Sequence, residues 1–345
     1  MGDDHAWESG RTAAHTRRGL LGAAAAAAGG AVVLVPRWAP EAGAATPVKP
    51  CVPDPVGFPT GAMAATPDGR RVWTTDLFGS TIATHSVKTL QRGRSIDVGG
   101  LPAGIAVAPD GTLALVTTAA ADRPGLALVD LGTGEVDRLD VGADPGAVAF
   151  ARTGRTAYVV DRGARGTLTR VRPASGRVAT PIAVGAHPRG LALDPAGKFA
   201  LVALNGDAAV AVVDLTRGRV IRRIATAPFP AQIAISPDGR RALVTHNGFG
   251  ARAVSLIDLR RRRVVHRTRV GADPGGVAFS RSGAGAVVSG AGSGTVTVLD
   301  GRTGRRLRTV KAPGAPRAVA ISGARGIVAD ARTGRLTAVG LGISA

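Results

Sequence analysis

A proline that precedes a short apolar run recurs along almost the whole chain, and this repeat constrains the fold more than any other feature. The repeat prolines are Pro59, Pro102, Pro145, Pro188, Pro230, Pro274 and Pro316. Their spacing is 42–44 residues. The matching turn glycines are Gly69, Gly111, Gly154, Gly197, Gly239, Gly283 and Gly323. A fixed period of this length predicts one closed array of repeated units.

Each unit contains four short segments separated by turn signals. In the fifth unit these segments are QIAI, ALVTH, AVSLID and VVHRTRV. The first is an apolar run typical of a strand buried on both faces, and the last is more polar, as expected of an outer edge. Four antiparallel strands every 40 to 45 residues or so indicate the blades of a propeller. We therefore predict an all-β fold, a seven-bladed β-propeller of four-stranded antiparallel blades over residues 57–345.

The unit resembles the YVTN-type β-propeller repeat of extracytoplasmic proteins. The segments that carry this resemblance include VGADPGAVAFARTGRTAYVVD and IATAPFPAQIAISPDGRRALVTHN, and the similarity covers about residues 56–345. The signature asparagine survives only at Asn205 and Asn247, which departs from the family pattern. The resemblance implies an exported bacterial propeller. It implies little about activity, because one fold hosts many functions.

The seventh unit contains only three predicted strands: Arg317–Ser322, Gly326–Asp330 and Leu336–Leu341. A fourth strand must come from elsewhere in the chain to complete this blade. Residues 45–56 are the candidate ring-closing strand. The prolines of this segment lack a backbone N–H, which an outer edge tolerates best.

Residues 1–44 have the order of a secretory signal. Paired Arg17 and Arg18 precede an uncharged run from Gly19 to Val35, and the small residues Ala42-Gly43-Ala44 follow. This order resembles a twin-arginine signal, which directs export of folded proteins. We expect cleavage after Ala44 and a secreted or cell-envelope location; a retained membrane anchor is the alternative. Cys51 is the single cysteine, so we expect a free thiol and no disulfide.

The formal net charge of +20 suits an anionic partner. Arginines scattered over solvated turns also explain it, because the one dense run is Arg260 to Arg263. Aromatic residues make up 3% of the chain, too few for a base-stacking platform, so nucleic acid is disfavoured. We expect a monomer whose partner is a small ligand, an anionic cell-envelope polymer or a protein.

The loops that enter strand one and those that join strands two and three lie on the same face of a propeller, around the channel mouth. Several polar residues occupy these positions. The predicted ligand-binding residues are Asp76, Asp144, Asp161, His187, Arg189, His246, Asn247, Asp273, Arg317 and Asp330. Arg162 occupies an adjacent position. Asp and Asn near turns also bond their own backbone, which is the structural alternative. For Asp130, Asp214, Asp258 and Asp300, at the ends of the third strands, we predict turn capping alone.

Two functions remain open from the sequence. The first is an exported, non-enzymatic propeller that binds a ligand or partner through the channel-mouth face. The second is a lactonase-like hydrolase, with His187, Arg189, His246 and Asp161 converging at the mouth, or a quinoprotein-like oxidoreductase. A quinone usually stacks on tryptophan, and Trp73 lies inside a predicted strand. No linear nucleophile or phosphate-binding motif is present, and we expect no metal and no cofactor.

Overall fold

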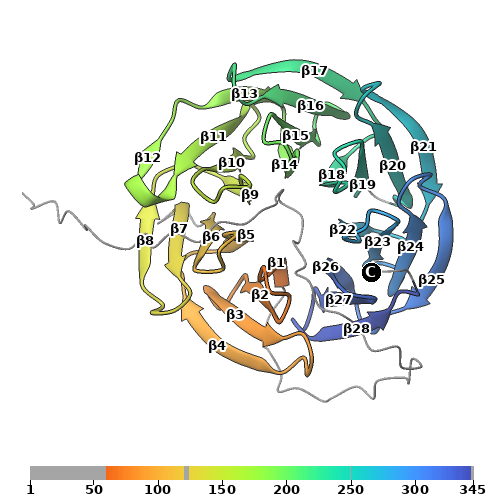
Figure 1. Cartoon of the computed structure of the whole chain (residues 1–345), viewed down its shortest axis with the longest axis horizontal. Helices are drawn as coiled ribbons and strands as arrows, with labels where there is room; N and C mark the ends of the chain where they lie inside the picture. Colours follow the sequence, from red (N-terminus) through yellow and green to blue (C-terminus); the bar gives the residue numbers. More distant parts are fainter. Residues whose placement is uncertain (1–59, 120–123, 249, 343–345) are drawn as a thin grey trace, which may run out of the picture.

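Seven antiparallel sheets surround a central axis in the computed structural model, which describes residues 60–119, 124–248 and 250–342 (Figure 1). The prediction of an all-β, seven-bladed propeller is confirmed. The expected signal (residues 1–44), Cys51 and the expected ring-closing strand (residues 45–56) lie outside the described residues. No helix among the described residues has the length and apolar character needed to cross a membrane.

The strands occupy equivalent positions in each blade. The innermost strands are β1 (Thr60–Ala65), β5 (Pro102–Val107), β9 (Pro145–Phe150), β14 (Pro188–Leu193), β18 (Pro230–Ile235), β22 (Pro274–Phe279) and β26 (Pro316–Ser322). The second strands are β2 (Arg71–Asp76), β6 (Leu113–Thr118), β10 (Ala157–Asp161), β15 (Phe199–Leu204), β19 (Arg241–His246), β23 (Gly285–Gly290) and β27 (Arg325–Asp330). The third strands are β3 (Thr81–Ser86), β7 (Gly125–Asp130), β11 (Gly166–Arg172), β16 (Ala209–Asp214), β20 (Ala253–Asp258), β24 (Thr295–Asp300) and β28 (Leu336–Gly340). The outer strands are β4 (Arg92–Asp97), β8 (Val136–Leu139), β12 (Arg177–Val178) with β13 (Ile182–Gly185), β17 (Arg219–Ala225), β21 (Arg263–Arg269) and β25 (Arg306–Lys311).

Two blades depart from four strands. In blade three the outer edge is divided into β12 and β13, which both pair with β11, and a short 3₁₀ helix (Pro173–Ser175) precedes them. Pro181 lies between the two pieces, and its missing N–H explains the interruption. Blade seven has three strands in the described part of the chain, as the sequence predicted.

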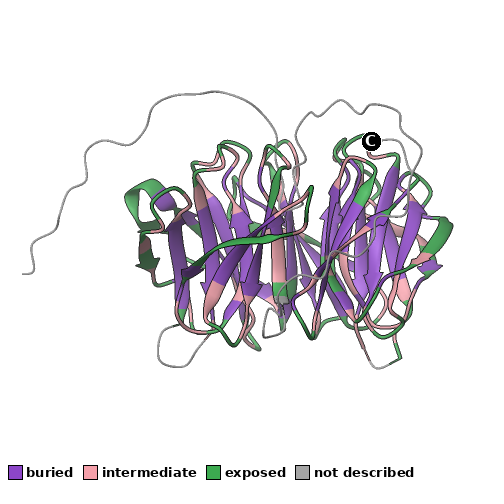
Figure 2. Ribbon diagram, turned by 90° about the horizontal axis from the view of Figure 1, so that it is seen from below, coloured by how far each residue is buried: buried purple, intermediate pink, exposed green. Residues whose placement is uncertain are grey.

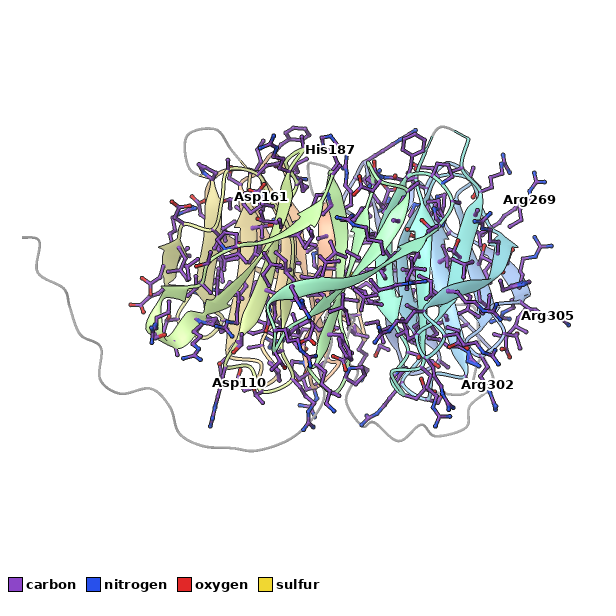
Figure 3. All side chains as sticks on the ribbon, turned by 90° about the horizontal axis from the view of Figure 1, so that it is seen from above. Asp110, Asp161, His187, Arg269, Arg302 and Arg305 are labelled. Atoms are coloured by element: carbon purple, nitrogen blue, oxygen red, sulfur yellow. The ribbon has the colours of Figure 1, made fainter. Side chains whose placement is uncertain are left out.

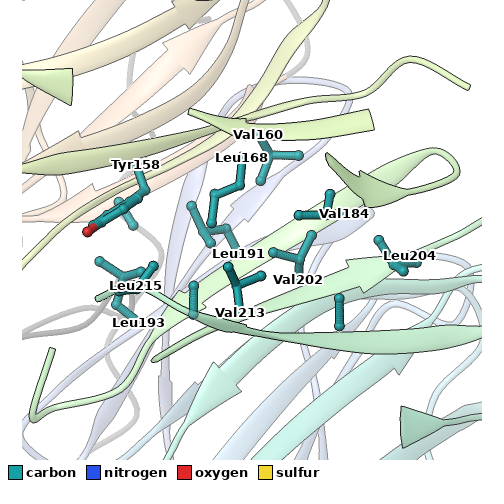
Figure 4. Close-up of a cluster of buried hydrophobic side chains, with 13 residues drawn as sticks. Tyr158, Val160, Leu168, Val184, Leu191, Leu193, Val202, Leu204, Val213 and Leu215 are labelled. Atoms are coloured by element: carbon teal, nitrogen blue, oxygen red, sulfur yellow. The ribbon is translucent and has the colours of Figure 1, made fainter. Parts of the chain in front are cut away.

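The hydrophobic core lies between the blades. Seven buried clusters are present, and each joins the facing sides of two neighbouring sheets. Figure 2 shows this buried material along the strands, with exposed residues in the loops of the two faces. Between blades three and four, Tyr158, Leu168 and Val184 pack against Leu191 and Leu204 (Figure 4). Each sheet buries both faces, which explains the near-continuous apolar character of the inner three strands.

The four aspartates at the ends of third strands cap turns, as predicted. Asp130 accepts the backbone N–H groups of Gly132 and Thr133, both at 2.8 Å. Asp300 does the same for Arg302 and Thr303. Asp214 accepts the N–H groups of Thr216 and Arg217, and Asp258 accepts that of Arg261. These carboxylates hold the turns between the third and outer strands.

Every inner strand carries a β-bulge at its start. In β14, for example, Pro188 pairs with Leu204 and the next paired residue is Leu191, which pairs with Val202. Inner strands of neighbouring blades also approach closely: a Cβ on Gly104 would lie 2.4 Å from the carbonyl oxygen of Gly146 in the next blade. The bulge re-aims the residue after the proline. It thereby determines which side chains reach the channel.

A buried histidine makes the stability of blade one depend on pH. His85 on β3 contacts the hydroxyl of Thr74 through Nε2 at 3.1 Å. Burial and the charge of Arg92 lower the pKa of His85 to about 4 from its usual 6.5. The unfolded chain therefore takes up a proton below pH 6.5 that the folded chain does not bind, and folding weakens as pH falls through this window.

We predict that this effect removes about 2–3 kcal/mol of unfolding free energy between these two pH values. His85→Gln abolishes that part of the pH dependence, whereas exposed His187→Gln retains it. Urea unfolding of the three proteins across the window measures the difference. Equal pH dependence in the His85 variant and the parent protein contradicts the prediction.

Candidate functional site

The central channel contains a cavity of about 550 Å³, lined by the inner strands and, in blades one and two, along nearly their whole length. The residue after the repeat proline lines this cavity in six blades. These residues are Ala103, Gly146, Arg189, Ala231, Gly275 and Arg317. The bulge places the backbone of these residues at the wall of the channel. This one repeat position therefore contributes to the lining in six of the blades, alongside residues from other positions.

The predicted site residues lie on one face of the propeller, opposite the turns that join strands one and two. Figure 3 shows Asp161 and His187 on one face of the disc and Asp110, from a turn between strands one and two, on the other. Only four of the ten predicted residues line the cavity. They are Arg189, Asn247, Asp273 and Arg317.

Arg189 and Arg317 supply exposed guanidinium groups from blades four and seven. Neither has an ion-pair partner among the described residues. The hydroxyl of Ser289 donates to the backbone carbonyl of Arg317 at 2.7 Å, which fixes the bulge in blade seven. Asp273, in blade six, is the carboxylate of the lining, and it adopts a left-handed φ of 50°.

Three of the seven non-glycine residues with positive φ in the described chain lie at the same rim. His187 and Phe229, like Asp273, precede repeat prolines and have φ values of 47° and 56°. Residues other than glycine rarely adopt this conformation, which costs free energy and clusters at functional sites. The three strained residues belong to consecutive blades, four to six.

Two polar pairs complete the rim. Arg162 lines the cavity and binds the Asp144 carboxylate through Nε at 3.1 Å and Nη2 at 2.5 Å. Asn205 donates to the side-chain oxygen of Asn247 at 3.2 Å, which joins blades four and five. The two asparagines kept from the repeat signature thus contact each other. Blades one and two contribute only glycine and apolar residues, so the polar lining is one-sided.

The other predicted residues are engaged in the scaffold or lie outside the cavity lining. Asp76 accepts the N–H of Gly79, and Asp161 accepts those of Asp144 and Gly163. His187 is exposed beside the rim.

His246 is buried inside blade five, where Nδ1 contacts the carbonyl of Pro228 and Nε2 contacts the Ser255 hydroxyl. Burial and the charge of Arg267 lower the pKa of His246, although the Pro228 carbonyl opposes the shift. Its side chain is therefore directed between strands rather than into the channel.

The residues named for the two enzymatic alternatives do not share the lining of the cavity. Of His187, Arg189, His246 and Asp161, only Arg189 lines the cavity. Trp73 is buried between blades one and two. No group of three or more His, Cys, Asp or Glu side chains suited to a metal ion occurs in the described ranges.

One lining residue, Gln232, escaped the sequence interpretation. It lies two residues after the blade-five proline, where the other blades have glycine or alanine, and its side chain borders the cavity. The sequence signal for it was a polar residue at a repeat position that is otherwise occupied by glycine or alanine.

Comparisons with known proteins identify the architecture alone. No protein-family profile matches the sequence, and no curated protein matches it either. Among solved structures, a chain of hydrazine synthase from Kuenenia stuttgartiensis superposes with a TM-score of 0.75 at 20% sequence identity. The match covers 87% of this chain and all of that one. At this identity the similarity concerns the propeller fold.

Asp330 shows how a predicted site residue at the rim instead holds the backbone of nearby turns. Its carboxylate accepts three backbone N–H groups, from Ala315, Arg332 and Thr333, at 2.7–2.8 Å. Burial favours the protonated form, but these donors outweigh it, so the pKa of Asp330 lies below its usual value.

We predict that Asp330→Ala lowers the unfolding free energy by about 2 kcal/mol, because three donors lose their acceptor. Asp330→Asn keeps an acceptor oxygen and loses less. Exposed Asp137→Ala, on β8, is the control and changes stability by less than about 0.5 kcal/mol. Urea denaturation gives the three values, and an unaltered Asp330→Ala protein excludes the capping role.

Proposed function

We propose that this protein binds a small anionic ligand at the channel mouth, without catalysis, and that it belongs to the exported YVTN-type repeat propellers. The observation that carries the binding proposal is the pair Arg189 and Arg317, two exposed guanidinium groups without ion-pair partners among the described residues, at the rim of one cavity. Guanidinium groups bind carboxylate and phosphate through charge-assisted hydrogen bonds.

The remaining lining supports an anion rather than a cation. Arg162 adds a third guanidinium, partly neutralised by Asp144, and Asp273 is the carboxylate that opposes them. Asn247 and Gln232 offer neutral donors and acceptors, which orient a ligand in many pockets. The cavity volume of about 550 Å³ is in the range of small-molecule sites.

Two single substitutions test the binding site. We predict that Arg189→Ala and Arg317→Ala each weaken binding of citrate or inorganic phosphate by about tenfold, because each removes one charge-assisted contact. Arg325→Ala, an exposed arginine at the start of β27 on the opposite face, leaves affinity unchanged. Isothermal titration calorimetry measures all four proteins, with glucose as an uncharged probe. Anion binding that survives in the Arg189/Arg317 double variant would falsify the site.

We further propose export through the twin-arginine-type signal of residues 1–44, which leaves the mature propeller secreted or associated with the cell envelope. Arg17→Lys combined with Arg18→Lys is expected to hold the precursor inside the cell, because the paired arginines are the feature that the translocase reads. Fractionation and immunoblotting of the full chain detect this. Undiminished export of the double-lysine variant rules out this route.

A further inference from the structure

The positive charge of the chain is strongly asymmetric. Residues 60–216 contain 16 Arg and Lys against 14 Asp and Glu, whereas residues 217–342 contain 23 against 5. Almost all of the excess charge therefore lies in the final part of the propeller, from the outer edge of blade four to blade seven.

Much of this charge forms a surface that we call the basic belt, defined as segments 217–223, 260–269 and 302–311. These segments contain fifteen Arg and Lys and no Asp or Glu. They comprise outer strands β17, β21 and β25, or parts of them, and the turns before each strand. The strands belong to consecutive blades at the circumference (Figure 1), and β17 contacts β21. Figure 3 shows Arg269 and Arg305 extending outward from this edge.

The belt arginines are largely unneutralised. In the described chain, three of them form ion pairs: Arg217 with Asp214, Arg223 with Asp207 and Arg261 with Asp258. Others, such as Arg222, Arg267, Arg269 and Arg306, are exposed and have no ion-pair partner among the described residues. Concentrated like charge disfavours the compact state and favours an anionic partner.

The fold does not require arginine at these positions. The outer strand of blade two occupies the same place in the repeat, and its edge carries Glu135, Asp137 and Asp140 beside Arg138. Acidic and basic edges therefore both support a complete blade. The belt is a property of this surface and not of propeller packing.

The shape of the basic belt favours some kinds of polyanion over others as its partner. It follows a convex edge across three blades, so a planar membrane meets it along a single blade at a time. A stiff nucleic-acid duplex, with a persistence length of about 150 base pairs, bends around such an edge only at a free-energy cost. The segments contain no Phe, Tyr or Trp on which the bases of a single strand stack. A flexible linear chain follows the edge without these penalties.

The spacing and the side chains within the belt indicate a phosphodiester polymer. Alternate residues of a strand, such as Arg267 and Arg269, present side chains about 6.6 Å apart. A polymer with one phosphate per short aliphatic unit places its charges at a similar interval. Val265 and Leu307 are exposed among the guanidinium groups and provide contacts for the carbon atoms of such a chain.

We infer that the basic belt binds a flexible, linear phosphodiester polymer that lacks stacking bases, at a surface separate from the channel mouth. The polymer lies along β17, β21 and β25, and the guanidinium groups pair with successive phosphates. Binding releases condensed counterions, so affinity falls steeply with salt.

Titration with a synthetic poly(glycerol phosphate) oligomer tests this inference. The belt variant combines Arg222→Gln, Arg267→Gln, Arg269→Gln and Arg306→Gln. The control variant removes the same charge from blade three through Arg152→Gln, Arg155→Gln, Arg172→Gln and Arg177→Gln. All eight arginines are exposed. We expect the belt variant to bind about a hundredfold more weakly, with a salt slope smaller by about 3, and the control to change less than about twofold.

Further measurements keep the inference falsifiable if the belt variant folds poorly. With the unaltered protein, affinity must rise with oligomer length, and monomeric glycerol phosphate must not compete. The Arg189/Arg317 double variant must bind the polymer normally, which separates this surface from the channel site. Tighter binding of oligodeoxythymidylate, or of phosphatidylglycerol vesicles, than of the polymer overturns the inference in favour of nucleic acid or membrane. Equal weakening in both four-residue variants also overturns it, because total charge alone then explains binding.

Discussion

Packing between the apolar faces of neighbouring sheets is the interaction on which this structure depends. Each of the seven buried clusters contains residues from two blades. A single four-stranded sheet therefore leaves both of its apolar faces exposed to water until its neighbours are in place. The last interface joins Ile327 and Leu336 of blade seven to Val72 of blade one. Closure at this interface is what makes the sheets a ring rather than an open stack.

The ring also determines how the channel is lined. Close approach of the inner strands excludes large side chains where the backbones nearly touch, as at Gly104 and Gly190. Hydroxyl groups at the fifth position of second strands bridge this gap: Thr117 donates to the carbonyl of Gly146 and Thr245 to that of Gly275. These bonds anchor the bulges of the next blade. Arg317, held in the same way by Ser289, owes its position to this geometry.

The repeat period, the turn glycines and the aspartate caps made the architecture predictable, because each reflects local backbone chemistry that recurs in every blade. The direction of individual side chains at the rim could not be predicted from the sequence in the same way. His246 and Asn247 are adjacent in sequence, yet one is buried against Ser255 and the other lines the channel. Successive side chains along an extended segment point in opposite directions, so the two residues face different surroundings. The bulge in the partner strand also shifts the pairing, so that aligned residues of different blades need not point the same way.

The basic belt illustrates a different limit. The sequence displays the run Arg260 to Arg263, but Arg222, Arg267 and Arg306 come from segments that are separated by most of a repeat. Only the placement of outer strands at one edge brings them together. The divided edge of blade three is likewise visible only from the strand pairing. Pro181 separates β12 from β13, but both strands remain paired with β11.

The bulge after each repeat proline has an evolutionary consequence. At Arg189 and Arg317 the side chain is exposed at the channel, so these two positions are less constrained by the packing between sheets than the buried positions beside them. Substitutions at these two positions alter what the lumen presents, whereas a Cβ on Gly275 would lie 2.6 Å from the carbonyl oxygen of Arg317 in the next blade. Glycine, alanine and arginine already occupy equivalent places in this single molecule, so one repeat position presents different chemistry to the lumen from blade to blade.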